Sequence, residues 1–225
     1  MKILALDAAT EACSVALQIN NEIISLYEVA PQQHSQKLLP FVDQVLAQAG
    51  IKLNQLDAIA FGQGPGSFTG VRIGVAITQG LAFGADLPTI GVSNLAVMAQ
   101  QAIIQLNAQQ VVAAIDARMS EVYLASFDNL NGIAIASSAE SVIKPELIEV
   151  TPLPQAIAVG TGWQTYKNEL LEKFQSQLSD ISLPNAEFML PLAIDAFHKG
   201  ELKEAEAAQP NYVRDEVSWK KLPGR

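Results

Sequence analysis

The chain has 225 residues, of which 49% are hydrophobic and 16% are charged, a composition that predicts one large or two small globular domains rather than a disordered chain. Its formal net charge of −9 would on average repel a polyanion such as tRNA, and a single cysteine excludes an internal disulfide. Its apolar runs are far shorter than the roughly 20 residues of a spanning helix, and its first residues do not resemble a signal peptide. We therefore expect a cytoplasmic protein without a membrane partner.

The first half of the sequence alternates short apolar segments with polar turns. The pattern predicts strands at residues 3–6, 14–19, 23–29, 58–61 and 89–92. Asn20-Asn21 favours a hairpin between the second and third of these strands. Three antiparallel strands followed by strands that alternate with helices are typical of an α/β fold with mixed sheets.

Helices are predicted between and after these strands. The first ends at Gly50 and contains Pro40, which either begins the regular part of the helix or kinks it. The second spans about 70–85 and follows a glycine-rich loop, and the third begins at the capping residue Ser93. The apolar face of the first helix consists of Leu38, Val42, Val45 and Leu46.

The second half of the sequence begins as the first does, with a strand, an aspartate and a turn. Asp116 then corresponds to Asp7. We interpret this as a duplication, with one unit at 1–106 and a smaller, less regular unit at 107–225. Further strands are predicted at 121–127 and 156–159, with helices at about 163–177, 186–199 and 201–208 and a basic tail containing Arg214, Lys220, Lys221 and Arg225.

Two aspartates at strand ends form the first candidate site. Asp7 with Thr10 and Ser14, and Asp116 in the second unit, could hold a metal ion or water beside a nucleotide phosphate between the units. Alternatively, Asp7 and Thr10 only close a hairpin turn. The glycine-rich segment 62–70 either cradles a phosphate or lets the following helix pack closely, and it lacks the lysine of a P-loop.

The helix at 70–85 carries four glycines. Each interior glycine costs about 1 kcal/mol relative to alanine, so a close backbone neighbour is expected to compensate. That neighbour is either the chain's own sheet or a partner helix. The histidines, His34 and His198, are far apart in sequence and form no local metal-binding pair, which disfavours a metalloprotease.

Several segments resemble the TsaB (YeaZ) family: ILALDAATEACSVAL at 3–17, GPGSFTGVRIG at 64–74, DARMSEVY at 116–123 and YVR at 212–214. The resemblance covers essentially the whole chain and is most specific at 64–74. It implies an actin/Hsp70/sugar-kinase-like fold with two ribonuclease-H-like halves and mixed sheets. The family's signature loop would consist of Gly64, Pro65, Gly66, Ser67, Thr69 and Arg72.

The resemblance implies a non-catalytic scaffold or activator of a TsaD-like threonylcarbamoyl transferase. That enzyme makes threonylcarbamoyladenosine on tRNAs that read codons starting with A. A TsaE-like ATPase would join through the complex, and tRNA would be contacted indirectly or through the basic tail. A lack of catalytic activity fits the residues, because Asn94 and Met98 stand where the catalytic relative carries a His-x-x-x-His metal pair.

The resemblance also implies no cofactor of the chain's own, beyond weak binding of ATP or ADP with Mg²⁺. Ala9 stands where the superfamily's phosphate motif has glycine, and Gly160-Thr161-Gly162 is a degenerate form of its adenosine-binding glycines. The vestigial nucleotide site would comprise Asp7, Thr10, Ser14, Asp116, Gly160 and Gly162.

Members of the family pair through their first two helices, either with the partner or as a homodimer. The interface implied here consists of Leu38, Val42, Val45, Leu46, Gly70, Val71, Gly74, Ile77, Thr78 and Leu81. The alternative is an autonomous actin-like ATPase or small-molecule kinase that uses Asp7 and Asp116. A metalloprotease has less support, and a ribonuclease would need a carboxylate cluster such as Asp7, Glu11 and Asp57.

Overall fold

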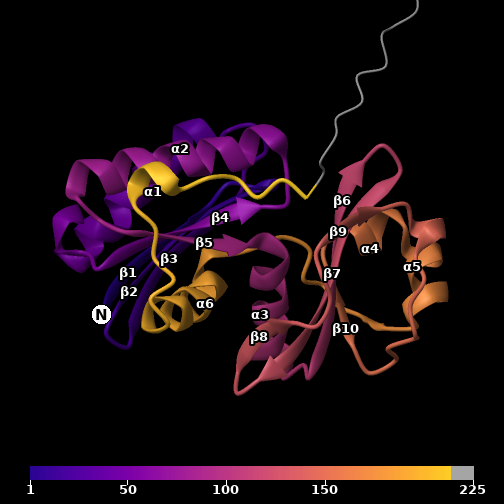
Figure 1. The fold of residues 1–225 in the computed structure, drawn as a ribbon. Coiled ribbons are helices and arrows are strands. Elements are labelled where there is room, and N and C mark those ends of the chain that lie inside the picture. Colours follow the sequence, from indigo (N-terminus) through magenta and orange to yellow (C-terminus); the bar gives the residue numbers. More distant parts are fainter. Residues whose placement is uncertain (214–225) are drawn as a thin grey trace, which may run out of the picture.

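The computed structural model describes residues 1–213, which form two mixed β-sheets (Figure 1). The strands of the first sheet are β1 (Lys2–Asp7), β2 (Ala12–Ile19), β3 (Glu22–Val29), β4 (Ala58–Gly64) and β5 (Thr89–Ser93). Their order is β3-β2-β1-β4-β5. β2 is antiparallel to both of its neighbours, whereas β4 runs parallel to β1 and β5.

The second sheet repeats this arrangement. Its strands are β6 (Gln110–Arg118), β7 (Glu121–Leu130), β8 (Ile133–Ala136), β9 (Ser141–Ile143), β10 (Ile157–Val159) and β11 (Gln177–Leu178). In the order β8-β7-β6-β10-β11, β7 is antiparallel to both neighbours and β10 is parallel to both. The predicted α/β class with two ribonuclease-H-like halves is confirmed, and β6 with Asp116 takes the place of β1 with Asp7.

Helices cover both faces of each sheet. They are α1 (His34–Ala49), α2 (Phe68–Ala85), α3 (Asn94–Leu106), α4 (Gly162–Thr165), α5 (Lys167–Phe174) and α6 (Ala186–His198). α1 and α2 pack on one face of the first sheet and α6 on the other. α3 packs on one face of the second sheet, and α4 and α5 pack on the other. Among residues 1–213, every helix is too short or too polar to cross a lipid bilayer.

Two of these helices cross between the halves. α3 follows the first sheet in sequence, yet Leu95 and Met98 pack with the second sheet. α6 follows the second sheet, yet Phe188 and Met189 pack with the first. The division into 1–106 and 107–225 stays a prediction from the sequence, and each predicted unit lends a helix to the core of the other.

The structure differs from the sequence prediction in several segments of the second half. The helix expected at 163–177 is interrupted at Tyr166, whose backbone angles (φ −121°, ψ 41°) are not helical. The short strands β8 and β9 were not predicted. The exposed helix expected at 201–208 contains only a 3₁₀ turn, Ala205–Ala207, because Ala205 and Ala208 are buried in the first core.

We call residues 200–213 the C-terminal strap, because this segment lies along the first half of the molecule. Figure 1 shows it in yellow, crossing from α6 to α2. The predicted basic tail, with Arg214, Lys220, Lys221 and Arg225, lies outside the described residues. In the first half, Pro40 lies inside α1, because that helix already begins at His34.

Candidate functional site

Asp7 ends β1 in a fully buried position. Its Oδ1 accepts a hydrogen bond of 2.5 Å from Asn94 Nδ2, and its Oδ2 accepts one of 3.4 Å from the backbone N–H of Ala9. Asn94 Oδ1 in turn accepts a hydrogen bond of 2.9 Å from Gly64 N. The side chain of Asn94 therefore joins the end of β1 to the signature loop, and these buried polar atoms all have partners.

The surroundings of Asp7 disfavour its charged form. Burial raises the pKa of this carboxyl from its ordinary value to about 7, although the hydrogen bonds from Asn94 and Ala9 lower it. The space beside it is also closed, because a Cβ on Gly62 would lie 2.0 Å from Asp7 Oδ1. Asp7 is thus an enclosed core carboxyl rather than a group that faces an open cleft.

Thr10 and Ser14 serve the local structure. Thr10 Oγ1 accepts a hydrogen bond of 3.4 Å from Ala12 N, within the turn that follows β1. Ser14 Oγ accepts one of 2.9 Å from Ala186 N, at the start of α6. Both hydroxyls therefore have roles in turn closure and helix docking.

The N-terminus of α2 covers the turn between β1 and β2. Ser67 N donates a hydrogen bond of 2.7 Å to Ala9 O. A Cβ on Gly66 would lie 2.3 Å from Ala9 O, and a Cβ on Gly70 would lie 2.1 Å from Ala8 O. These two glycines let the helix approach the turn, so close packing accounts for this part of the glycine-rich segment.

The second candidate aspartate has a more open environment. The side chain of Asp116 is 19% exposed. Its Oδ1 accepts hydrogen bonds from Arg118 N at 2.9 Å and from the Tyr166 hydroxyl at 3.5 Å. Arg118 also lies 4.0 Å from Glu11 Oε1, so the turn after β6 faces the turn after β1.

Close packing also explains Gly160 and Gly162. Gly160 has a φ of +103°, and a Cβ on it would lie 2.1 Å from Ala114 O. A Cβ on Gly162 would lie 2.9 Å from the Cβ of Ala114. Both glycines therefore allow the start of α4 to pack against β6.

A bound magnesium nucleotide does not fit the residues at the first turn. The carboxyl of Asp7 is enclosed, and α2 covers the turn that would have to approach a phosphate. Among residues 1–213, no group of three or more His, Cys, Asp and Glu side chains is placed to hold a metal ion. The second turn, around Asp116, is more accessible but offers one carboxylate next to an arginine.

The predicted interface residues on α1 point inward. Leu38, Val42, Val45 and Leu46 are buried in the core between α1 and the first sheet. Their helical spacing reflects packing on the chain's own sheet, so a partner would have to contact the opposite side of the helix. On α2, the residues buried in the same way are Gly70, Val71, Gly74 and Thr78, and those partly buried are Ile77 and Leu81.

The outward face of α2 is apolar as well, and its exposed aromatic residues are not among the interface residues predicted from the sequence. Phe68 is 58% exposed and Phe83 is 72% exposed. A Cβ on Gly80 or Gly84 would meet no atom of residues 1–213 within 4 Å. Arg72 is the one charged residue in the 18-residue sequence of this helix. A helix that is apolar all round normally has all its sides covered. The nearly uncharged, apolar sequence of α2 is therefore the signal that could have identified this surface.

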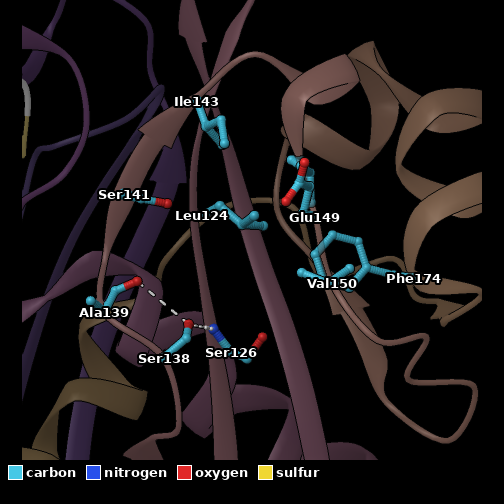
Figure 2. A pocket seen from close by; sticks show the side chains of 10 residues that line it. Leu124, Ser126, Ser138, Ala139, Ser141, Ile143, Glu149, Val150 and Phe174 are labelled. Carbon is cyan, nitrogen blue, oxygen red and sulfur yellow. Dashed lines mark hydrogen bonds between the residues drawn. The ribbon is translucent and has the colours of Figure 1, made fainter.

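A cavity of about 180 Å³ lies in the second half, between β7, β9, α5 and residues 148–150 (Figure 2). Ser126 and Ser138 line it together, and Ser126 N donates a hydrogen bond of 2.9 Å to Ser138 Oγ. Glu149 is the acidic residue in its wall. None of the site residues predicted from the sequence lines this cavity.

The comparisons with known proteins agree with the resemblance. The model of the family described as "TsaD: tRNA N6-adenosine threonylcarbamoyltransferase" matches residues 20–214. "tRNA threonylcarbamoyladenosine biosynthesis protein TsaB" of Escherichia coli K12 is 47% identical, with both chains covered completely. The protein of the same description from Haemophilus influenzae is also 47% identical, over all of this chain and 98% of its own.

A solved structure, "YeaZ from Pseudomonas aeruginosa", is 44% identical and superimposes with a TM-score of 0.88. The match covers 94% of this chain and 99% of that one. The duplicated sheets, the signature loop and the sequence identity over the full length lead to the same assignment. The chain belongs to the TsaB family, within the wider family that the TsaD model describes.

Proposed function

We propose that this chain is a non-catalytic scaffold or activator of a TsaD-like threonylcarbamoyl transferase that forms threonylcarbamoyladenosine on tRNA. The observation that carries the proposal is the outward face of α2, an apolar and nearly uncharged surface on an otherwise acidic chain. Exposed apolar patches of this kind mark protein–protein contacts. The full-length identity to TsaB relatives and the match to the TsaD model support this choice of reaction.

The non-catalytic part of the proposal is supported by Asn94 and Met98. These residues stand where the catalytic relative is expected to carry metal-binding histidines. Asn94 is used here as a buried bridge between Asp7 and Gly64. Met98 is fully buried in the second core. The side-chain oxygen of Asn94 is already engaged by Gly64 N, and the thioether of Met98 does not suit a hard divalent metal.

The docking face would be formed by the outward side of α2 with the adjacent side of α1. Its small residues, Ala76, Gly80 and Gly84, would let a partner helix approach closely. Phe83 and the half-exposed Leu39 of α1 would supply larger apolar contacts. Without its partner, the chain would use this face to pair with a second copy.

The other components would be reached through this complex. A TsaE-like ATPase would join through the transferase, and tRNA would be contacted indirectly or through the basic tail. The chain would need no cofactor of its own, and ATP or ADP with Mg²⁺ would bind weakly. This part of the proposal is supported by the poor fit of a nucleotide at the first turn.

Reconstituted tRNA modification tests the proposed function. The mixture would contain the transferase subunit, the ATPase, threonylcarbamoyl-AMP and tRNA, with or without this chain. Modification should depend on the chain, and the purified chain alone should neither hydrolyse ATP nor modify tRNA. Equal modification without the chain, or ATP turnover by the chain alone, would contradict the proposal.

A substitution on α2 tests the docking face. Ala76→Glu places a charge at an exposed position in the middle of the outward face, and it should reduce both binding of the transferase subunit and tRNA modification at least tenfold. Ile104→Glu, at a half-exposed apolar position on α3, is the matched control and should leave both unchanged. Thermal unfolding of each variant would confirm that the monomer is folded.

A further inference from the structure

We propose that Phe68, Arg72 and Tyr212 form one composite anchor for the transferase subunit, and that the C-terminal strap is therefore a required part of the docking face. The inference rests on the proposed function, because it names further contacts for the same partner. It concerns a segment that follows α6 in the chain and that the sequence did not connect with α2.

The three side chains form a stack at the N-terminal end of α2. The guanidinium carbon of Arg72 lies 3.4 Å from the centroid of the Phe68 ring. Arg72 Nε donates a hydrogen bond of 2.8 Å to the Tyr212 hydroxyl, across 140 residues of sequence. The two aromatic rings are 6.4 Å apart between centroids. A cation–π contact and a hydrogen bond thus hold the three groups in one arrangement before any partner binds.

The stack remains open to solvent. Phe68 is 58% exposed and Tyr212 is 50% exposed. Contacts at such exposed positions contribute little to the folding of the chain itself. Aromatic residues and arginine are the residue types that most often dominate the binding energy of protein interfaces. The exposure and composition of the stack therefore favour a role in binding another protein.

The stack continues the apolar face of α2. Phe68 and Phe83 are 15 positions apart on one helix, which corresponds to a span of about 22 Å. A stable interface of standard size buries about 800 Å² on each partner, which needs a surface of this extent. One partner lying along α2 would thus reach the stack at one end and Phe83 at the other.

The strap is held along its length, and this positions Tyr212. Thr89 and Lys203 exchange backbone hydrogen bonds of 2.7 and 3.0 Å. Gln79 Nε2, on α2, donates a hydrogen bond of 2.8 Å to the carbonyl of Ala208. Asn211 N then donates one of 2.7 Å to Gln63 O, one residue before Tyr212. Figure 1 shows this segment crossing from α6 to the region of α2.

Asn211 also connects the strap with the second half. Its Nδ2 donates a hydrogen bond of 3.3 Å to Glu140 Oε2. The other oxygen of Glu140 accepts a hydrogen bond from Ser93 Oγ, at the N-cap of α3. Burial raises the pKa of Glu140. Asn211, the residue before Tyr212, is thus hydrogen-bonded to both halves. The position of the anchor therefore depends on how the two halves are arranged.

The chemistry of the stack defines what the partner must offer. The Tyr212 hydroxyl accepts its hydrogen bond from Arg72, so its own proton can be donated to an acceptor on the partner. Arg72 adds a positive charge that suits a carboxylate. The ring of Phe68 needs an apolar surface. We therefore expect an acidic side chain of the transferase subunit next to apolar residues at this end of α2.

Binding of the full-length chain to the purified transferase subunit, measured by calorimetry, tests the anchor. Tyr212→Ala should weaken binding about 30-fold, which is typical of an interface hot spot. Tyr212→Phe and Arg72→Met should each weaken binding about fivefold, and the double variant should weaken it less than the product of the two, since both remove one shared hydrogen bond. Tyr27→Ala, at a half-exposed tyrosine on the edge strand β3, is the matched control and should have no effect.

The outcomes separate this inference from the proposed function. If the wild-type chain binds and Ala76→Glu prevents binding, while the variants at Arg72 and Tyr212 bind as the wild type does, the anchor is wrong and the docking face stands. If the wild-type chain does not bind the subunit at all, both proposals fail. A Tyr212→Ala variant that no longer pairs with a second copy of the chain, but still binds the transferase subunit as the wild type does, would also overturn the anchor. Should Tyr212→Ala lower the unfolding temperature, Tyr212→Phe and Arg72→Met decide the question.

Discussion

The two halves carry an aspartate at equivalent positions, Asp7 on β1 and Asp116 on β6, but the two side chains differ in burial. In the first half Asp7 is fully buried, and the turn behind it lies under the N-terminus of α2. In the second half Asp116 is 19% exposed, and the turn behind it reaches into solvent. A shared position in a duplicated fold therefore does not imply a shared role, because the neighbouring elements decide what the carboxyl can do.

This difference also bears on the docking face. The helix that covers the first turn is the helix whose outward side is apolar and exposed. Gly66 and Gly70 bring its N-terminus within contact of Ala8 and Ala9. The turn after β1 thus holds the N-terminus of α2 in place by close packing and by the hydrogen bond from Ser67 N to Ala9 O. In the second half, α4 follows β10 as α2 follows β4, but it packs against Ala114 within β6, and residues 118–120 of the turn stay exposed.

The largest expected effect concerns the buried carboxyl of Asp7. Its pKa of about 7 in the folded state lies above the value of 3.8 expected in an unfolded chain. The folded state therefore binds more protons between these values, and stability falls as pH rises through this range. The penalty above pH 7 amounts to about 4 kcal/mol. Asp7→Asn should remove most of this pH dependence, as measured by urea unfolding at pH 5 and pH 8.

Asp116→Asn is the matched control for that experiment, because it changes the equivalent carboxyl in the open turn. It should leave the pH dependence caused by Asp7 in place. Glu140, whose pKa burial also raises, accounts for a smaller slope in the same direction. Equal stability of the wild-type chain at pH 5 and pH 8 would show that Asp7 is not the enclosed group described here.

The close packing of α2 on the turn after β1 gives the next largest effect. Gly70→Ala would place a Cβ 2.1 Å from Ala8 O, so the helix or the turn must move, at a cost of about 3 kcal/mol. Gly80→Ala is the control on the same helix, where a Cβ meets no atom of residues 1–213 within 4 Å. It should stabilise the chain by about 0.5–1 kcal/mol through helix propensity. Urea unfolding measures both, and similar values for the two variants would refute the packing explanation.

These glycines illustrate how far the sequence could lead. Their spacing predicted a close backbone neighbour, and it left open whether that neighbour was the chain's own or a partner's. The structure places Gly70 and Gly74 near Ala8 and leaves Gly80 and Gly84 open, so the chain's own backbone accounts for the first two glycines and not for the other two. Local sequence could not separate them, because the answer depends on Ala8, in a turn far earlier in the chain.

Other segments were predictable to the extent that local signals decided them. The strands of the first half and the cap at Ser93 follow from apolar runs and turn residues, and they are confirmed. The segment 201–208 has the composition of a helix, but the burial of Ala205 and Ala208 and the pairing of Lys203 with Thr89 override that preference. The apolar face of α1 was identified correctly as a face, but spacing alone does not tell an internal sheet from a partner.

The open turn of the second half gives the smallest effect and a test of its backbone strain. Met119 and Ser120 have φ values of 56° and 60°, a left-handed conformation that costs residues other than glycine about 1 kcal/mol or more. The next turn of the same sheet has Asn131 and Gly132 in that conformation, the pair that such hairpins favour. Replacing Met119-Ser120 by Asn-Gly should therefore stabilise the chain by about 1 kcal/mol.

The reverse exchange completes this comparison. Asn131→Met with Gly132→Ser should destabilise the chain by a similar amount, because it imposes on the β7–β8 turn the residues that the β6–β7 turn tolerates. Thermal unfolding measures both variants. An unchanged or lower unfolding temperature for the Asn-Gly variant at 119–120 would mean that contacts of Met119 offset the strain. A higher temperature would show that the second half keeps a strained, solvent-facing turn at the position where the first half has an enclosed one.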